Sequence, residues 1–188
     1  MAFHFFANPA NPDLEALVNL YSLCLSLTQS VTDLTNHTNL MSICPSFIDR
    51  TMTLAGFIIL KLVRSPCAQH LDLAAGERAY FQAVQSCKNM SIQHNDLCAR
   101  AAAIMSSLWG SLRVFKRKDG TVESLGLRLR TRLSMSVSFD MFWYWREEFG
   151  NMLNPYNDDK SSGPDNDNTS MPSTGHQPET PRKSSLLD

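Results

Sequence analysis

The chain has 188 residues, of which 43% are hydrophobic and 19% are charged, with a formal net charge of -1. These values exclude a collagen-like chain and a chain that is disordered throughout. The longest apolar run, Met52 to Val63, is interrupted by Lys61 and is shorter than the roughly 20 residues that a membrane helix needs, so no membrane segment is predicted. The amino terminus lacks the positive region of a secretory signal, which predicts an intracellular chain.

Apolar residues are distributed unevenly along the chain. About half of residues 1–150 are apolar, whereas residues 151–188 contain only six apolar side chains and consist mostly of Ser, Thr, Asn, Asp, Pro, Gly and Gln. Such a composition cannot compensate for the entropy that is lost on ordering. We therefore predict one folded domain over residues 1–150 and a disordered tail over residues 151–188.

Helices are predicted throughout the folded part. Prolines occur where apolar periodicity begins or stops, and none occurs between Cys67 and Asn154. The first helix is expected over residues 12–27, because Asn11-Pro12-Asp13 supplies a typical helix start. The Thr- and Asn-rich residues 28–39 are expected to form a short helix or a loop.

Three further helices follow. The helix over about residues 45–65 has apolar residues on every side, which predicts a central position covered by its neighbours. A third helix begins after Asp72, a good N-cap, and carries one apolar face. A fourth is expected to be capped by Asn95, with Asp96 paired to Arg100 four residues further on.

The last predicted helix lies in a segment with two competing patterns. Residues 116–120 contain Asp-Gly and indicate a basic, hairpin-like turn or loop. Leucines then alternate with arginines, which alone would indicate a short strand, but apolar residues also recur every four positions from Leu125 to Trp145. The longer periodicity favours a helix over residues 126–149 that ends at Gly150. The predicted fold class is all-α, an irregular bundle of about five to six helices with a disordered C-terminal tail.

The cysteines and histidines give one candidate metal site. Five cysteines occur at positions 24, 44, 67, 87 and 98 without a close pair, which in an intracellular protein predicts small buried side chains. The alternative is a zinc-binding or thiol enzyme that uses Cys67, His70, His94 and Cys98. The sequence has no nucleophile elbow, phosphate-binding loop or metalloprotease motif. We therefore predict a protein that is not an enzyme and has no cofactor.

A basic stretch is the first candidate contact site. Residues 113–132 contain seven basic and two acidic side chains. Arg128, Arg130 and Arg132 are the candidates for contact with an anionic effector or partner, because guanidinium groups match carboxylates and phosphates. Nucleic-acid binding, a solvated face and internal ion pairs with Asp140 and Glu147 are the other interpretations.

Four consecutive aromatic residues at positions 142–145 are the second candidate. So much aromatic surface must be enclosed by other helices or by a partner. Core packing is one interpretation, and an apolar pocket wall or docking face formed by Trp143 and Trp145 is the other.

In the tail, Thr180 precedes a proline and matches a proline-directed phosphorylation site.

Several segments together carry a family resemblance: Leu54 to Lys61, Asn95-Asp96 with Arg100, Leu108-Trp109, Arg132 to Val137, and Phe139-Asp140 followed by Phe142 to Phe149. They resemble the carboxy-terminal part of the regulatory region of fungal binuclear zinc cluster transcription factors, in the branch similar to the leucine-biosynthesis regulator of yeasts. The resemblance extends over about residues 45–150 and is strongest at its end. Tyr144 stands where relatives commonly have the middle of three tryptophans.

The resemblance implies that residues 1–150 form a helical regulatory domain that controls an attached DNA-binding zinc cluster, sometimes in response to a metabolite. The family reads DNA with six closely spaced cysteines, which this chain lacks, as it lacks the family's coiled-coil segment. None of its cysteines is therefore carried over as a zinc ligand, and no sequence-specific DNA binding by this chain alone is expected. We expect a truncated product or a free-standing regulatory piece.

The expected partners are a small anionic metabolite and proteins of the transcription machinery or co-regulators. The resemblance implies a location in the nucleus, with the cytoplasm as the alternative for a fragment without a nuclear signal. Besides the zinc or thiol enzyme, a purely structural helical scaffold is the remaining alternative.

Overall fold

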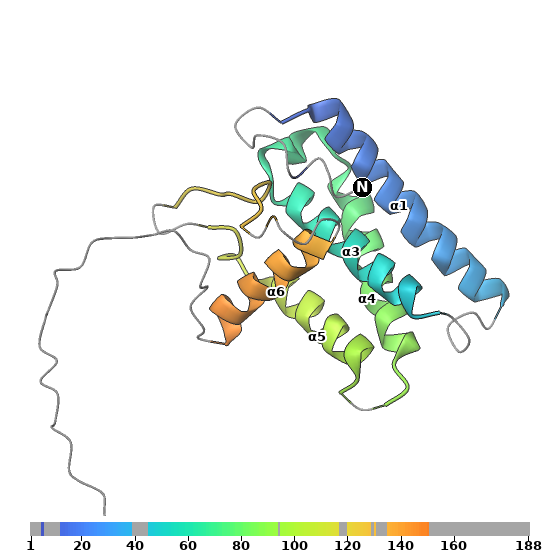
Figure 1. The fold of residues 1–188 in the computed structure, drawn as a ribbon. Helices are drawn as coiled ribbons and strands as arrows, with labels where there is room; N and C mark the ends of the chain where they lie inside the picture. Colours follow the sequence, from blue (N-terminus) through green and yellow to red (C-terminus); the bar gives the residue numbers. More distant parts are fainter. Residues whose placement is uncertain are drawn as a thin grey trace, which may run out of the picture. The chain divides into compact units, whose positions relative to one another are not determined.

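The computed structural model describes residues 5, 12–38, 45–93, 95–116, 120–128, 130 and 135–150. These residues form five α-helices and a short 3-10 helix, and their β-type pairing is limited to one isolated bridge (Figure 1). The predicted all-α fold is confirmed. No helix in this part of the chain is long and apolar enough to cross a membrane. The tail predicted over residues 151–188 lies outside the described residues.

The central element is the helix that the sequence predicts to be central. The elements in chain order are α1 (Leu14–His37), α3 (Ser46–Val63), η2 (Pro66–His70), α4 (Leu73–Met90), α5 (Leu97–Gly110) and α6 (Ser136–Phe149). Helix α3 contacts all the others (Figure 1), and its side chains from Phe57 to Leu60 are fully buried. A Cβ at Gly56 would collide with the methyl group of Met105, so this glycine allows α3 and α5 to approach closely.

Helix α1 is longer than the sequence predicts. It continues through residues 28–37, so the boundary predicted at residue 27 is wrong. Three threonines bond back to helix carbonyls: Thr28 to Cys24 at 3.1 Å, Thr32 to Thr28 at 2.8 Å and Thr35 to Val31 at 2.7 Å. A threonine hydroxyl can therefore form a hydrogen bond inside a helix. Burial of Thr28 and Val31 outweighs the weak helix propensity of these two β-branched residues.

Aspartates cap the starts of α4 and α5. Asp72 accepts a hydrogen bond from the Ala75 N–H at 3.0 Å, which confirms the predicted start of α4. For α5 the predicted cap at Asn95 is wrong, because Asn95 adopts a left-handed φ of 65° and Asp96 occupies the cap position. The Asp96 carboxylate accepts N–H groups from Ala99 at 2.8 Å and from residues 92 and 93 at 2.8 and 3.1 Å, in place of the predicted pair with Arg100.

Residues 120–128, before α6, are not helical, although the sequence predicts a helix from residue 126. Lys116 and Val122 form an antiparallel bridge, and Gly120 has a φ of 84°, which agrees with the predicted hairpin-like turn. The helix predicted from residue 126 begins only at Ser136, although it ends before Gly150 as expected. Residues 124–127 are all buried and none of them is helical, so this stretch follows neither the four-residue spacing of the predicted helix nor the two-residue period of a strand.

Candidate functional site

A fully buried ion pair joins α3 to α6. The Lys61 ammonium lies 2.9 Å from the Asp140 carboxylate, and neither side chain is exposed. Lys61 also donates to the carbonyl of Gly126 at 3.0 Å. Its Nζ lies 5.0 Å from the centre of the Phe115 ring and within 6 Å of two more rings, so it is stabilised by aromatic faces as well as by oxygen atoms. The carboxylate, the carbonyl and the aromatic rings thus offset the free-energy cost of removing the Lys61 ammonium from water.

Asp140 connects three segments that are distant in the sequence. One carboxylate oxygen accepts from Lys61, and the other accepts from the Arg128 N–H at 3.2 Å. Because Lys61 binds Gly126 as well, the non-helical segment 123–128 is held between α3 and α6 by polar contacts at two positions. Asp140 therefore joins α6 both to α3 and to the segment before α6.

Arg128 extends this network towards the surface. Its guanidinium forms an ion pair with Glu147 at 2.6 Å and lies 4.1 Å from the centre of the Tyr144 ring. Both charged side chains retain about a fifth to a quarter of their exposure, at 22% and 25%. Tyr144 itself is buried, and this burial raises the pKa of its hydroxyl. We call Lys61, Asp140, Arg128, Glu147 and Tyr144 the charged cluster.

A second set of contacts fixes the other side of α6 to α5 and the turn after it. The indole N–H of Trp145 donates to the Ser107 hydroxyl at 2.9 Å. Glu148 accepts from the Arg113 guanidinium at 3.0 Å and from the Ser111 hydroxyl at 3.2 Å. The ends of α5 and α6 are thereby joined by polar side chains, of which Arg113 is exposed and the others are half-buried.

The structure separates the three arginines that the sequence groups together. Arg128 is half-buried in the charged cluster, and its guanidinium pairs with Glu147, which confirms that part of the internal ion-pair interpretation. The ion-pair partner of Asp140 is Lys61 instead, and Arg128 reaches Asp140 only through its backbone N–H. Arg130 is exposed and its Nε donates only weakly, to the Leu127 carbonyl at 3.5 Å. The predicted site at Arg132, like that at Thr180, lies outside the described residues.

The aromatic run divides between the core and the surface. Tyr144 is buried, and Phe142 packs edge-on against Phe57 with ring centres 5.6 Å apart. Trp145 is half-buried against the core, whereas Trp143 is half-buried beneath the Arg146 guanidinium, 5.4 Å from its ring centre. Core packing therefore accounts for much of the run, and contact of Trp143 and Trp145 with an effector stays a prediction.

Sequence reasoning missed Lys61 as a member of the site. It is the single charge in an apolar run on a helix that is buried on all sides, and this is a signal that could have found it. A buried lysine requires an anionic partner, and the two candidates, Asp140 and Glu147, had already been considered as partners of the arginines.

The proposed zinc ligands do not come together in the part of the chain that the structure describes. Cys67 and His70 lie in η2 before α4, whereas Cys98 lies in α5 after it, and a helix of 18 residues is about 27 Å long. His94 lies outside the described residues. Among the described side chains, no three His, Cys, Asp or Glu residues are placed to hold a metal ion.

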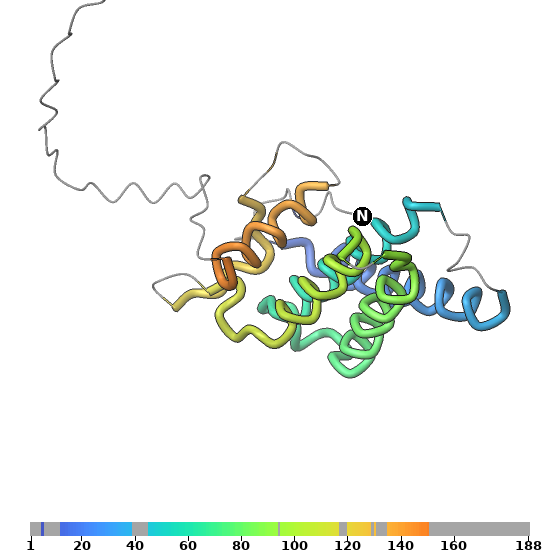
Figure 2. Tube along the Cα trace, turned by 90° about the horizontal axis from the view of Figure 1, so that it is seen from below, coloured from blue at the N-terminus to red at the C-terminus, as the bar shows by residue number. Residues whose placement is uncertain are grey.

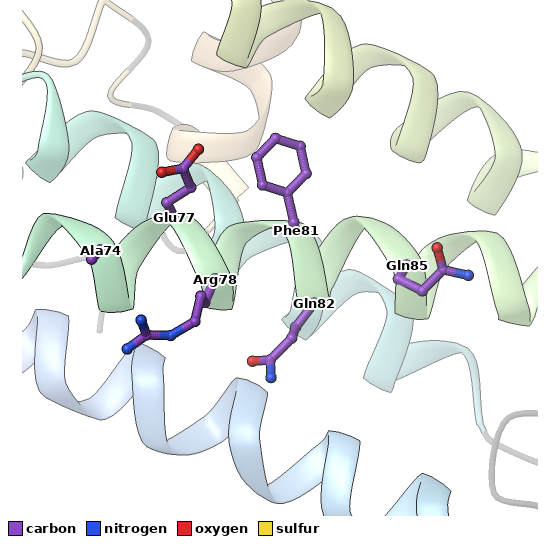
Figure 3. Close-up of a pocket in the computed structure, with 6 residues that line it drawn as sticks. All are labelled: Ala74, Glu77, Arg78, Phe81, Gln82 and Gln85. Atoms are coloured by element: carbon purple, nitrogen blue, oxygen red, sulfur yellow. The ribbon is translucent and has the colours of Figure 1, made fainter.

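A shallow hollow of about 590 Å³ lies on the outer face of α4. Its lining comes entirely from this helix: Ala74, Glu77, Arg78, Phe81, Gln82 and Gln85 (Figure 3). The hollow is separate from the charged cluster, which is built from α3, α6 and the segment before α6.

The comparisons with known proteins give one significant relative. The chain is 29% identical over 104 residues to the "Regulatory protein LEU3" of Saccharomyces cerevisiae, a match that covers 50% of this chain and 12% of the yeast protein. Over half its length, the chain is similar to a fungal regulatory protein. It spans only about an eighth of that relative's length, and no family model and no solved structure matches it.

Proposed function

We propose that this chain is the regulatory, effector-responsive portion of a fungal transcription factor and that it acts through ligand or protein contacts, without catalysis. The observation that carries the proposal is the similarity to the yeast regulatory protein over half the chain. The charged cluster supports it, because it gives the helical domain a polar connection through which α6 could change its position relative to α3.

The mechanism that we propose is a change in how α3 and α6 pack. A small anionic metabolite or an acidic group of a co-regulator would contact Arg128, Arg130 and Arg132, with Trp143 and Trp145 as the apolar wall. Arg128 would then exchange Glu147, at 2.6 Å, for the incoming anion. Such a ligand shifts the equilibrium only if it binds one arrangement of α6 more tightly than the other.

The site of action follows from the same proposal. The protein would act in the nucleus through the transcription machinery or co-regulators, and Thr180 in the tail would be available for phosphorylation. The chain alone would not bind DNA with sequence selectivity. A gel-shift titration of the purified 188-residue chain at physiological salt tests this point, and tight, sequence-selective binding would contradict it.

A reporter assay tests the regulatory role. The full chain is fused to a heterologous DNA-binding domain, and transcription is compared with that from the DNA-binding domain alone. We expect a change in output that Arg128→Gln reduces, because this variant breaks the bond to Glu147, and that Arg100→Gln, at an exposed position of α5, preserves. Equal output from the fusion and the DNA-binding domain alone would contradict the proposal.

Ligand binding is tested separately by thermal shift against a panel of small carboxylic acids. A ligand that binds only the folded chain must raise its melting temperature, and Arg128→Gln should reduce that rise.

Metal analysis of the purified protein tests the alternative hypothesis of a zinc-binding or thiol enzyme. Stoichiometric zinc that is lost on Cys98→Ala would favour the rival over the regulatory proposal.

A further inference from the structure

The outer face of α4 has a pattern of side chains that its own domain does not use. Glu77 and Arg78 are exposed, and neither forms an ion pair with another residue that the structure describes. Figure 2 shows α4 at the edge of the bundle, and in Figure 3 Glu77 and Arg78 project from opposite sides of the helix. The hollow between them is lined by Ala74 and Phe81.

Phe81 is an exposed aromatic side chain that is held in position. It retains 43% of its exposure, yet its ring packs edge-on against Tyr80 and Trp109, with centres 5.8 and 5.5 Å apart. Tyr80 in turn is buried and donates to the Met105 carbonyl at 2.8 Å. Phe81 therefore presents a rigid apolar surface, which loses little side-chain entropy when a partner covers it.

Helix geometry places these residues on one self-complementary face. Successive residues of an α-helix are about 100° apart, so Ala74 and Phe81, seven positions apart, lie along one line. Glu77 and Arg78 fall on the two sides of that line and at nearly the same height along the axis. A two-fold axis parallel to α4 would exchange the two sides, and each Glu77 would then meet an Arg78.

We propose that this face of α4 is a docking surface for a second copy of the same chain. The two α4 helices lie parallel around a two-fold axis, with Ala74 near the centre and each Phe81 on the Glu77 side of the contact. The close approach is possible because Ala74 is small, and reciprocal Glu77–Arg78 ion pairs flank the contact. This inference does not depend on the proposed function.

The charge pattern favours a second copy over an unrelated partner. Any partner must supply a cation opposite Glu77, an anion opposite Arg78 and an apolar group opposite Phe81. A second α4 supplies both charges in the required order and adds the apolar surface of Ala74 and Phe81 beside them. The contact is small and its ion pairs are exposed, so the association should be weak and reversible, and more salt-dependent than a purely apolar contact.

Charge reversal gives the decisive experiment. Sedimentation velocity over a range of concentrations should reveal a reversible dimer of the full chain. Glu77→Arg or Arg78→Glu alone should lower the association constant by about tenfold or more, because each variant replaces both ion pairs with like charges. The double variant E77R/R78E should dimerise again. An equimolar mixture of the two single variants should form heterodimers, because arginines on one chain then face glutamates on the other.

Matched controls separate the docking surface from general effects. Phe81→Ala should weaken the dimer, whereas Phe47→Ala, at a position with 64% exposure on α3, should not. Arg100→Glu changes the net charge as much as Arg78→Glu and should have no effect. All these positions are exposed, so circular dichroism should confirm folding. A monomer at all concentrations, a dimer insensitive to both reversals, or single variants that fail to associate when mixed would each overturn the proposal.

Discussion

Lys61 of α3 and Asp140 of α6 are 2.9 Å apart, and neither side chain has any contact with solvent. Taking both charges out of water costs nearly as much as their attraction returns, so the net contribution of such a pair to stability is small. Losing one partner is different, because the remaining charge stays buried without compensation. The pair therefore specifies where α6 lies more than it stabilises the domain.

Double-mutant analysis of this pair gives the first prediction. Lys61→Met or Asp140→Leu alone should lower the free energy of unfolding by about 3–5 kcal/mol, because each leaves a buried charge unpaired. The double variant should recover part of that loss, although the Arg128 N–H still loses its acceptor. Urea unfolding followed by circular dichroism measures all three variants. Lys88→Met, at an exposed position of α4, is the control and should change stability by no more than about 0.5 kcal/mol.

The outcome that contradicts this prediction is additivity. If the double variant is as unstable as the sum of the single variants, the two side chains act independently. The buried charges would then not be energetically coupled.

The second prediction compares two glycines. A Cβ at Gly76 would collide with the hydroxyl of Tyr21, whose ring is buried and whose hydroxyl donates to the Asp72 carbonyl at 2.6 Å. Gly76→Ala must displace that ring and should destabilise the domain by about 1–3 kcal/mol. At Gly110, the last residue of α5, a Cβ meets no atom within 4 Å, so Gly110→Ala should be neutral or stabilising by up to about 1 kcal/mol. Thermal unfolding of both variants tests the difference in sign.

The starts and ends of several helices could be predicted because their determinants are local. Asp72 caps α4 and Gly150 follows α6 as expected from the sequence, and prolines confine α3 to the predicted range. The end of α1 could not be predicted this way. Thr28 has a weak intrinsic helix propensity, and only its burial against neighbouring helices, which is not visible in the sequence, keeps it helical.

The site was predictable only in part, for a similar reason. The sequence suggested internal ion pairs of the arginines with Asp140 and Glu147. It did not identify Lys61, the observed partner of Asp140, which lies 79 positions earlier in the chain. Periodicity gives the face of a residue within its own element and says nothing of which distant element covers it. Around residue 126 the sequence contained both a two-residue and a four-residue period. The structure follows neither, because residues 124–127 are buried together in a non-helical segment whose Gly126 carbonyl accepts from Lys61.

Thiol reactivity provides the third prediction. Cys98 is only half-buried, yet desolvation and the neighbouring Asp49 carboxylate, 3.5 Å from its sulfur, raise the pKa of its thiol to about 12. Because the thiolate is the reactive form, alkylation of Cys98 by iodoacetamide at pH 8 should be slow. Asp49→Asn removes the negative charge and should accelerate the reaction. Mass spectrometry of alkylated peptides measures the rate at each cysteine.

Cys24 is the internal control for that measurement. It is completely buried, and burial raises the pKa of its thiol to about 12, so it should react only when the domain unfolds, in the parent chain and in Asp49→Asn alike. If the variant accelerates both cysteines equally, the substitution has loosened the fold. A Cys98 that reacts as fast as a free thiol in the parent chain would contradict the electrostatic argument.

The fourth prediction concerns acid stability and Asp96. The N–H of Ala99, followed by those of Gln93 and Ile92, lowers the pKa of this carboxyl from 3.8 to about 2 in the folded chain. A carboxyl with a lowered folded-state pKa stabilises the protein above its unfolded pKa and loses that effect as the pH falls towards its folded pKa. Asp96→Asn cannot accept all three N–H groups and does not titrate. The urea midpoint of the parent chain should therefore exceed that of the variant most at pH 5 and above, and the difference should shrink between about pH 4 and pH 2. Other carboxyl groups titrate equally in both proteins, so a difference that does not change with pH would show that Asp96 acts as a neutral cap.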